Sequence, residues 1–130
     1  MGLVAGVARE PIATPIGGAL MGYGARTGAA RAVHDPLFAR ALHLRDGRGA
    51  LLLVELDVCL LAPGHAESVR ARLAAATGVA RECILVGSIH THSGPETGIA
   101  AWIGGAGMPP ATRALCDAAV AAGARAHGAA

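Results

Sequence analysis

Hydrophobic and polar positions along residues 36–58 predict a β-hairpin. Two strand-like runs flank Asp46-Gly47, a dipeptide suited to the positive φ angles of a tight turn. The second run is continuously apolar over residues 51–54, which is typical of a central strand covered on both faces. We therefore expect two antiparallel strands, the second of them inside a sheet.

The pattern changes to a helical period over residues 65–77, and Gly78 follows where helices often end. The apolar stripe of this predicted helix consists of Val69, Leu73 and Ala76. Residues 82–89 are a second apolar run and predict another strand. Strand, helix and strand at this spacing form a βαβ unit with parallel strands. Ligands of such sheets bind beyond the carboxyl ends of the strands, where Asp57 and His90 stand.

The remaining segments are more irregular. Residues 3–8 predict a short strand, which leads into a glycine- and proline-rich loop containing "LMGYGARTG". Residues 99–109 predict a glycine-rich loop around the only tryptophan. An alanine-rich helix is expected from Pro110 to about His127, with Gly123 as a weak point. Its stripe consists of Leu115, Ala118, Ala119 and Ala122. The expected fold is α/β: a mixed sheet with a hairpin and a βαβ crossover, and helices packed on the sheet.

Length and composition agree with one small domain over residues 1–130. The chain is 53% hydrophobic, but alanine supplies much of this, so we expect a thin core. The net charge is +2, from scattered arginines with almost no aromatic residues, which gives little support to nucleic-acid binding. The start lacks the pattern of a signal peptide, and no apolar run is long enough to span a membrane, so the chain as given is expected in the cytoplasm.

Three cysteines, Cys59, Cys83 and Cys116, have no CxxC spacing. Buried reduced thiols are the favoured interpretation, ahead of a disulfide or a metal site.

His90 and His92 are the main chemical candidates because they stand where an apolar run ends. On an extended backbone, residues i and i+2 point to the same face, so both imidazoles should face one side while Thr91 faces the other. Such a pair offers two ligands to one zinc ion, or one ligand and one proton carrier to one pocket. The alternative, two partly exposed polar residues that end a strand, stays open at this point.

Other polar residues have weaker cases. Asp57 can orient one imidazole as a hydrogen-bonded carboxylate, or it can cap a strand end, and the sequence does not separate these roles. The stretch from His34 to Pro36 favours a turn. His43 alternates with apolar neighbours and His65 stands at a helix start, so both are interpreted as structural.

Serine and nucleotide chemistry have no support. Ser88 and Ser93 lie outside a GxSxG elbow, and no phosphate-binding glycine motif stands at a strand-to-helix junction.

Three stretches together resemble a known family. They are "VAGVAREPIATPIGGALMGYGAR" at residues 4–26, "VHDPLFARALHLRDGRGALLLVELDV" at 33–58 and "ILVGSIHTHSGP" at 84–95. In this order they resemble the N-terminal part of the neutral/alkaline non-lysosomal ceramidase family. "HTHSGP" is the most specific piece, and "MGYG" is the second.

The resemblance implies a zinc-dependent amidohydrolase that cleaves the N-acyl bond of ceramide or a related lipid amide. It assigns His90 as a Zn²⁺ ligand. His92 would face the same pocket, as a further metal ligand or as a catalytic residue that assists proton transfer or holds the oxyanion. Zinc would polarise the amide carbonyl and lower the pKa of a water to roughly 7.

Family members are several times longer than this chain, and their further zinc ligands and serine-containing segment come from later positions. No residue after Pro95 supplies them, and His127, in a weak C-terminal helix, is not a replacement. We therefore expect a single incomplete domain that carries only the first part of the site. Self-association through an uncovered apolar face is also expected.

Two alternatives remain at this stage: a non-catalytic remnant or binding module of the same fold, and a different metallohydrolase that takes further ligands from a partner chain.

Overall fold

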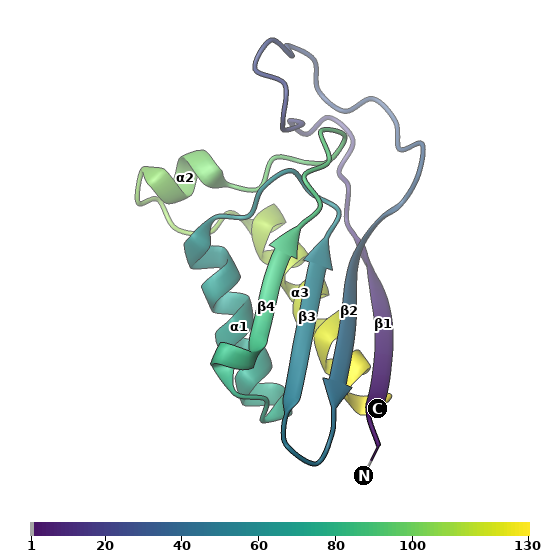
Figure 1. Cartoon of the computed structure of the whole chain (residues 1–130). Coiled ribbons are helices and arrows are strands. Elements are labelled where there is room, and N and C mark those ends of the chain that lie inside the picture. The colour runs from purple at the N-terminus through teal and green to yellow at the C-terminus, as the bar shows by residue number, and fades with distance from the viewer. Residues whose placement is uncertain (1) are drawn as a thin grey trace.

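The computed structural model describes residues 2–130 and contains one four-stranded sheet with helices behind it (Figure 1). The strands are β1 (Val4–Ile12), β2 (Leu37–Arg45), β3 (Ala50–Leu56) and β4 (Ile84–Ser88), in that spatial order. The helices are α1 (Pro63–Thr77), α2 (Ile99–Ile103) and α3 (Pro110–Gly128), and the 3₁₀ turn η1 covers Arg81–Cys83. β1, β2 and β3 pair antiparallel, and β4 pairs parallel to β3. The mixed α/β sheet with a hairpin and a βαβ crossover is therefore confirmed.

The hairpin between β2 and β3 forms as expected, but its turn differs. No residue from 46 to 49 has a positive φ angle. The side chain of Asp46 holds the turn instead, because its Oδ1 accepts hydrogen bonds from the backbone N–H groups of Arg48 (2.7 Å) and Gly49 (3.1 Å). Because the Asp46 side chain holds the turn, no residue in it needs the positive φ angle that glycine favours.

The strand boundaries at the two ends of the sheet also differ from expectation. β1 extends to Ile12 rather than ending at residue 8, and Pro11 lies opposite Phe38 within it. Proline is tolerated there because β1 is an edge strand. β4 is shorter than the expected 82–89, since η1 precedes it and the strand ends at Ser88.

The core lies on one face of the sheet, between the strands and helices α1 and α3 (Figure 1). Leu52 and Val54 of β3 are buried there, but Leu51 is exposed on the other face. The expectation that β3 is covered on both faces was therefore wrong, because both long helices pack on the same side. Self-association through the open face stays a prediction.

Helix α1 begins two residues before His65 and ends where expected, with Gly78 in the left-handed conformation (φ 72°). Its buried stripe is His65, Val69 and Leu73, at spacings of four residues. Ala76 is exposed, contrary to expectation, because a stripe at this spacing continues toward Thr77 instead.

Gly123 marks the close approach of α3 to α1. A Cβ at this position would lie 2.6 Å from Leu73 Cδ2 and 3.3 Å from Val54 Cγ2. The residue that seemed only to weaken α3 therefore lets the two helices and the sheet pack tightly. In the expected stripe, Leu115, Ala119 and Ala122 are buried and Ala118 is half-buried.

The loop expected at 99–109 contains the short helix α2, which carries Trp102. No helix within residues 2–130 is long and apolar enough to cross a membrane.

Candidate metal centre

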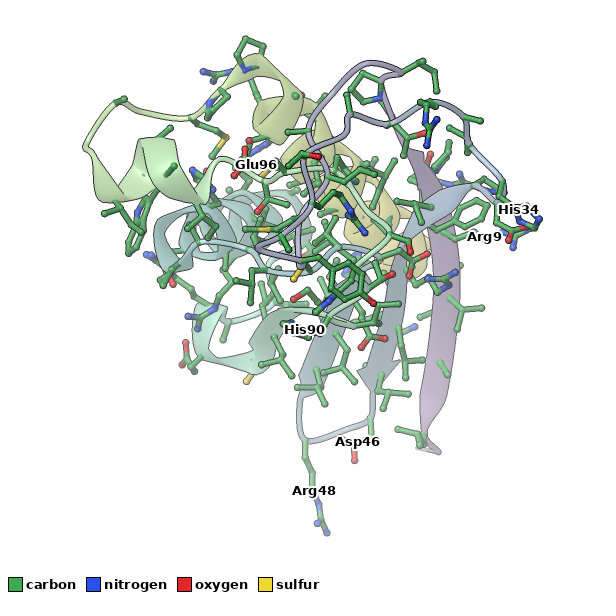
Figure 2. All side chains as sticks on the ribbon, turned by 90° about the horizontal axis from the view of Figure 1, so that it is seen from above. Arg9, His34, Asp46, Arg48, His90 and Glu96 are labelled. Atoms are coloured by element: carbon green, nitrogen blue, oxygen red, sulfur yellow. The ribbon has the colours of Figure 1, made fainter. Side chains whose placement is uncertain are left out.

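The candidate centre lies beyond the carboxyl ends of β3 and β4. Because these strands are parallel neighbours, the segments that follow them leave the sheet at the same edge. Cys59 is the third residue after β3, and His90 is the second after β4. Figure 2 looks down on this edge and shows His90 over the strand ends, with His34 well apart from it.

His90 bends the chain, because its φ angle of 62° lies in the left-handed region. The expectation that His90 and His92 share a face by extended-strand alternation was therefore wrong, since β4 has already ended at Ser88. The two imidazoles nevertheless meet. Their Nε2 atoms are 3.2 Å apart, and the ring centroids are 4.9 Å apart at an interplanar angle of 69°.

The carbonyl oxygen of Cys59 sets the proton position on His90. This oxygen lies 2.8 Å from Nδ1 of His90, and a carbonyl can only accept a hydrogen bond. Nδ1 must therefore carry the proton, which leaves the lone pair on Nε2 directed toward His92. A metal-binding histidine typically has this arrangement, with its second nitrogen bonded to a carbonyl or carboxylate.

Asp57 does not have the orienting role that was one of its two interpretations. Its Oδ2 accepts a hydrogen bond from the backbone N–H of Phe38 (2.9 Å), and its Oδ1 pairs with Arg40. Asp57 is buried and ties the end of β3 to β2. The strand-end interpretation is confirmed, because the guanidinium of Arg40 offers the carboxylate a stronger partner than a neutral imidazole does.

Cys59 joins the two histidines as a third potential ligand. Its Sγ lies 3.8 Å from Nδ1 of His90, and one ligand atom from each of the three residues lies within 4.8 Å of the others. Cys59 is buried, His90 is exposed and His92 is intermediate. No spacing motif relates this cysteine to His90, which lies 31 residues further along the chain. The common signal is the position of both residues just after parallel strands.

The "MGYG" segment packs directly on His92. The ring of Tyr23 meets that of His92 edge-on at a centroid distance of 4.7 Å, and Nη2 of Arg26 donates to the carbonyl oxygen of His92 (2.9 Å). Gly22 has a φ of 113°, and a Cβ there would lie 2.4 Å from Cγ of His92. The two most specific pieces of the sequence resemblance are therefore in contact.

Backbone hydrogen bonds hold these two loops together. The N–H of Met21 donates to the carbonyl oxygen of Gly94 (3.1 Å), and the N–H of Glu96 donates to that of Ala19 (2.9 Å). Leu20 and Pro95 form an isolated antiparallel bridge between them. The long irregular loop after β1 is thus fastened to the histidine loop.

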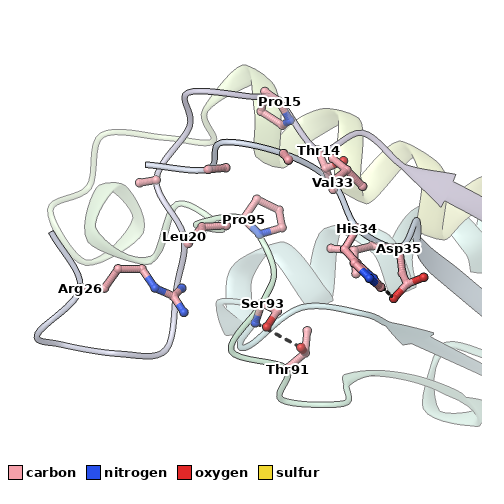
Figure 3. Close-up of a pocket in the computed structure, with 14 residues that line it drawn as sticks. Thr14, Pro15, Leu20, Arg26, Val33, His34, Asp35, Thr91, Ser93 and Pro95 are labelled. Atoms are coloured by element: carbon pink, nitrogen blue, oxygen red, sulfur yellow. Dashed lines mark hydrogen bonds and ion pairs between the residues drawn. The ribbon is translucent and has the colours of Figure 1, made fainter. Parts of the chain in front are cut away.

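A cavity of about 550 Å³ lies between the same two loops, and neither His90 nor His92 lines it (Figure 3). Thr91 and Ser93, which alternate with the histidines, line it, and so do Arg26, His34 and Asp35. Its apolar lining includes Pro15, Leu20, Val33, Leu37 and Pro95. Nδ1 of His34 lies 2.7 Å from Asp35, and this hydrogen bond, with the carboxylate charge, raises the pKa of His34.

The remaining candidates lie in the packed body of the molecule. His43 and His65 are buried, in keeping with structural roles, and the ring of His127 lies 4.8 Å from that of His43. The three thiols are free, and Cys59 and Cys116 are buried while Cys83 is intermediate. Burial raises the pKa of the Cys116 thiol to about 11.

The fold of the chain is similar to that of solved structures. No protein-family model matches the chain. Neutral ceramidase from Pseudomonas aeruginosa has a similar structure, with a TM-score of 0.80 and 24% identity over 97% of this chain. This chain has the fold of part of that ceramidase. A ceramidase complexed with C2 gives a TM-score of 0.79 and 24% identity, again over 97% of this chain. The chain spans 21% of the length of either neighbour.

Proposed function

We propose that this chain carries the first part of a zinc-dependent amidohydrolase site for the N-acyl bond of ceramide or a related lipid amide. The observation that carries the proposal is the 3.2 Å contact between the Nε2 atoms of His90 and His92. It lies at the carboxyl ends of strands in a fold shared with neutral ceramidase from Pseudomonas aeruginosa.

The donor atoms fit zinc. Two nitrogen ligands of a tetrahedral zinc ion, each at about 2.0–2.1 Å from the metal, lie roughly 3.3 Å apart. The Nε2 atoms of His90 and His92 already have this separation. The bond from Nδ1 of His90 to the Cys59 carbonyl keeps the other nitrogen free to bind. When bound, zinc would act as a Lewis acid toward the amide carbonyl and the attacking water.

His90 has one role in this proposal, and His92 has two candidate roles. His90 holds the metal through Nε2. His92 is either a second ligand through Nε2 or a proton carrier and oxyanion donor at that atom. A single Nε2 atom cannot bind the metal and carry a proton at the same time. The zinc affinity of a His92→Ala variant therefore distinguishes the two roles. A ligand role predicts a large loss of affinity, and a proton-carrier role predicts bound zinc with turnover lost.

The cavity beside Thr91 and Ser93 supports a substrate with a hydrocarbon part. Its volume of about 550 Å³ and its apolar residues offer space at Thr91 and Ser93, the chain neighbours of His92. Ligand pockets in proteins commonly combine such an apolar lining with a few polar groups. We propose that one end of a lipid amide occupies this space while the amide group reaches the His90–His92 edge.

Two histidines alone are fewer ligands than the three protein ligands of most catalytic zinc sites. We therefore propose that turnover needs groups beyond those two. The alternative function, a binding module of the same fold without catalysis, rests on this same shortage.

The test is zinc stoichiometry together with hydrolysis of a short-chain N-acyl amide by the purified chain. We expect one zinc per chain, lost in His90→Ala and retained in His34→Ala, a matched control at an exposed histidine whose ring pairs with Asp35. Turnover that depends on His90 would show that this chain supplies the catalytic groups, whereas stoichiometric zinc without turnover would limit it to metal binding, as the first part of a larger site or as a binding module. A zinc content equal to that of His90→Ala would exclude both for this chain.

A further inference from the structure

We propose that the α2 tip, defined as residues 97–108, docks on the surface of a phospholipid membrane, with Trp102 and Ile103 entering the lipid. This inference rests on the proposed function for the kind of partner, because a substrate with a long hydrocarbon part collects in a membrane rather than in water. Docking brings the end of the molecule that carries His90 and His92 to the lipid that holds such a substrate.

The two ends of the molecule differ in polarity. The loops beyond the carboxyl ends of β3 and β4 lie together with α2 at one end, and the hairpin turn lies at the other (Figure 1). Several large apolar side chains are exposed at the first end, among them Ile16, Tyr23, Leu60, Trp102 and Ile103. The hairpin turn instead exposes Asp46 and Arg48. An exposed group of apolar side chains commonly marks an interaction site.

The α2 tip combines the greatest exposure at this end with an absence of charge. Ile103 is 73% exposed and Trp102 is 42% exposed. The sequence contains no charged residue from 97 to 112. A charged side chain would have to leave water on docking, which is costly, so its absence suits contact with lipid. Tryptophan is enriched where membranes meet water, because its ring is apolar and its N–H is polar.

Backbone N–H groups of the α2 tip already have hydrogen-bond partners inside the protein. Oε1 of Glu96 accepts from the N–H groups of Gly98 (2.8 Å) and Ile99 (3.0 Å), so this neighbouring carboxylate is turned toward the start of α2. Further N–H groups donate to carbonyl oxygens within the tip, at Trp102, Gly104, Gly105 and Ala106. Lipid offers no partners to replace water, so a segment that satisfies its own backbone can leave water at little cost.

The α2 tip is also fixed relative to the candidate centre. It starts at Thr97, shortly after the loop that carries His92. Thr97 is buried, and its hydroxyl donates to the carbonyl oxygen of Leu60 (2.7 Å). A Cβ at Gly64 would lie 2.6 Å from Nε1 of Trp102, so the indole rests against the start of α1. A docked tip therefore sets the orientation of the candidate centre toward the lipid surface.

A second copy of the chain fits this surface less well than lipid does. A stable protein interface takes roughly 20–30 residues from each partner. In the α2 tip, Trp102 and Ile103 are followed by glycine and alanine alone over residues 104–107, which offer little side-chain area for packing. Two apolar side chains that project beside small residues can enter lipid without a complementary partner surface. Surface docking needs no membrane-spanning helix.

The test uses the fluorescence of Trp102, which is the only tryptophan in the chain and therefore reports on the α2 tip alone. The full chain is mixed with vesicles of phosphatidylcholine, which carry no net charge. We expect the emission to shift to shorter wavelength, and we expect quenching when the acyl chains carry bromine. Binding should persist at high salt, because charges contribute little to the contact.

A pair of variants locates the contact. Ile103→Ser should lower the vesicle affinity about tenfold, since burial of one large aliphatic side chain accounts for a factor of this size. Leu85→Ser is the matched control, because leucine is an isomer of isoleucine and Leu85 is 64% exposed on the open face of the sheet. Its affinity should equal that of the wild type. Cosedimentation with vesicles measures the affinities, and circular dichroism checks that both variants fold.

Three results would overturn the docking of the α2 tip. The first is no binding to vesicles, and zinc-dependent turnover of a short-chain amide by the same preparation would then leave the proposed function standing. The second is binding that Leu85→Ser weakens and Ile103→Ser does not, which would place the contact on the sheet. The third is a wavelength shift without lipid that grows with protein concentration, which would mean that a second copy covers the tip. Docking by a chain that binds no zinc would support the docking surface and contradict only the proposed function.

Discussion

Two histidine pairs in this molecule have almost the same ring separation but very different surroundings. His43 and His127 have centroids 4.8 Å apart between β2 and α3, and His90 and His92 have centroids 4.9 Å apart at the edge of the sheet. His43 is 1% exposed, whereas His90 is open to solvent. Proximity of two imidazoles therefore does not by itself define a site.

The two pairs differ in the hydrogen-bond partners of their ring nitrogens. Neither nitrogen of His43 has a hydrogen-bond partner within residues 2–130. Burial lowers the pKa of His43, and the charges of His127 and Arg45 lower it further, so this ring stays neutral. In the other pair, the Cys59 carbonyl fixes the proton on Nδ1 of His90, and a sulfur stands close by. His43 and His127 therefore contribute to core packing, whereas His90 and His92 have the features of a metal centre.

The largest expected effect is on metal binding. His90→Ala should weaken zinc binding by about 100-fold or more, because it removes a direct ligand and even supporting residues contribute 10–100-fold. His127→Ala should leave zinc affinity unchanged, since its ring lies against His43. Isothermal titration calorimetry of the two variants measures the zinc affinity. Equal losses of affinity would show that the two histidine pairs do not differ in metal binding.

A smaller loss is expected from Gly22→Ala. The added Cβ would overlap the ring of His92, and the φ of 113° disfavours any side chain. We expect zinc affinity to fall by about tenfold, as for residues that position a ligand. Gly24→Ala is the matched control, because a Cβ there meets no atom within 4 Å. The same zinc titration measures both, and an unchanged affinity in Gly22→Ala would show that the loop does not position His92.

At the buried pair, His43→Leu should stabilise the fold by about 1 kcal/mol at pH 7, because it replaces a buried polar group lacking partners with an apolar side chain of similar size. Chemical denaturation gives the free energy of unfolding. A loss of stability instead would mean that the imidazole makes interactions essential to the core.

The smallest effect is the acid dependence of stability. The folded-state pKa of His43 lies below its ordinary value of 6.5, so below pH 6.5 the unfolded chain binds a proton that the folded chain does not. Stability from this group is intact above pH 6.5 and falls as the pH drops below it. Between pH 7 and 6 the loss is about 0.7 kcal/mol at most. Denaturation curves at both values should show it in the wild type, and His43→Leu should lack this component.

Local patterns in the sequence predict much of the fold. The hairpin and the βαβ crossover follow from runs of apolar residues and their periods, which are local properties. The length of β1 was missed because its last residues are held by pairing with β2, in spite of Pro11. The packing role of Gly123 was missed for a similar reason, because its small size matters only through its close contact with Leu73 in another helix.

The candidate site was predicted in part. His90 and His92 were identified as neighbours, but the reason given was strand alternation, and the chain in fact turns at His90. Cys59 is a buried free thiol, as its sequence context predicts, but no sequence spacing predicts that the sheet places it beside His90 and His92. Asp57 had two open roles, and Arg40 decided between them.

Nitrogen NMR of the histidine side chains during a zinc titration tests the central claim most directly. The predicted result is a shift of Nε2 in His90 and His92 at one equivalent of zinc, with Nδ1 of His90 still protonated and His43 and His127 unchanged. Zinc-dependent shifts at His43 or His127, with His90 unaffected, would contradict the claim that the metal centre lies at the ends of β3 and β4.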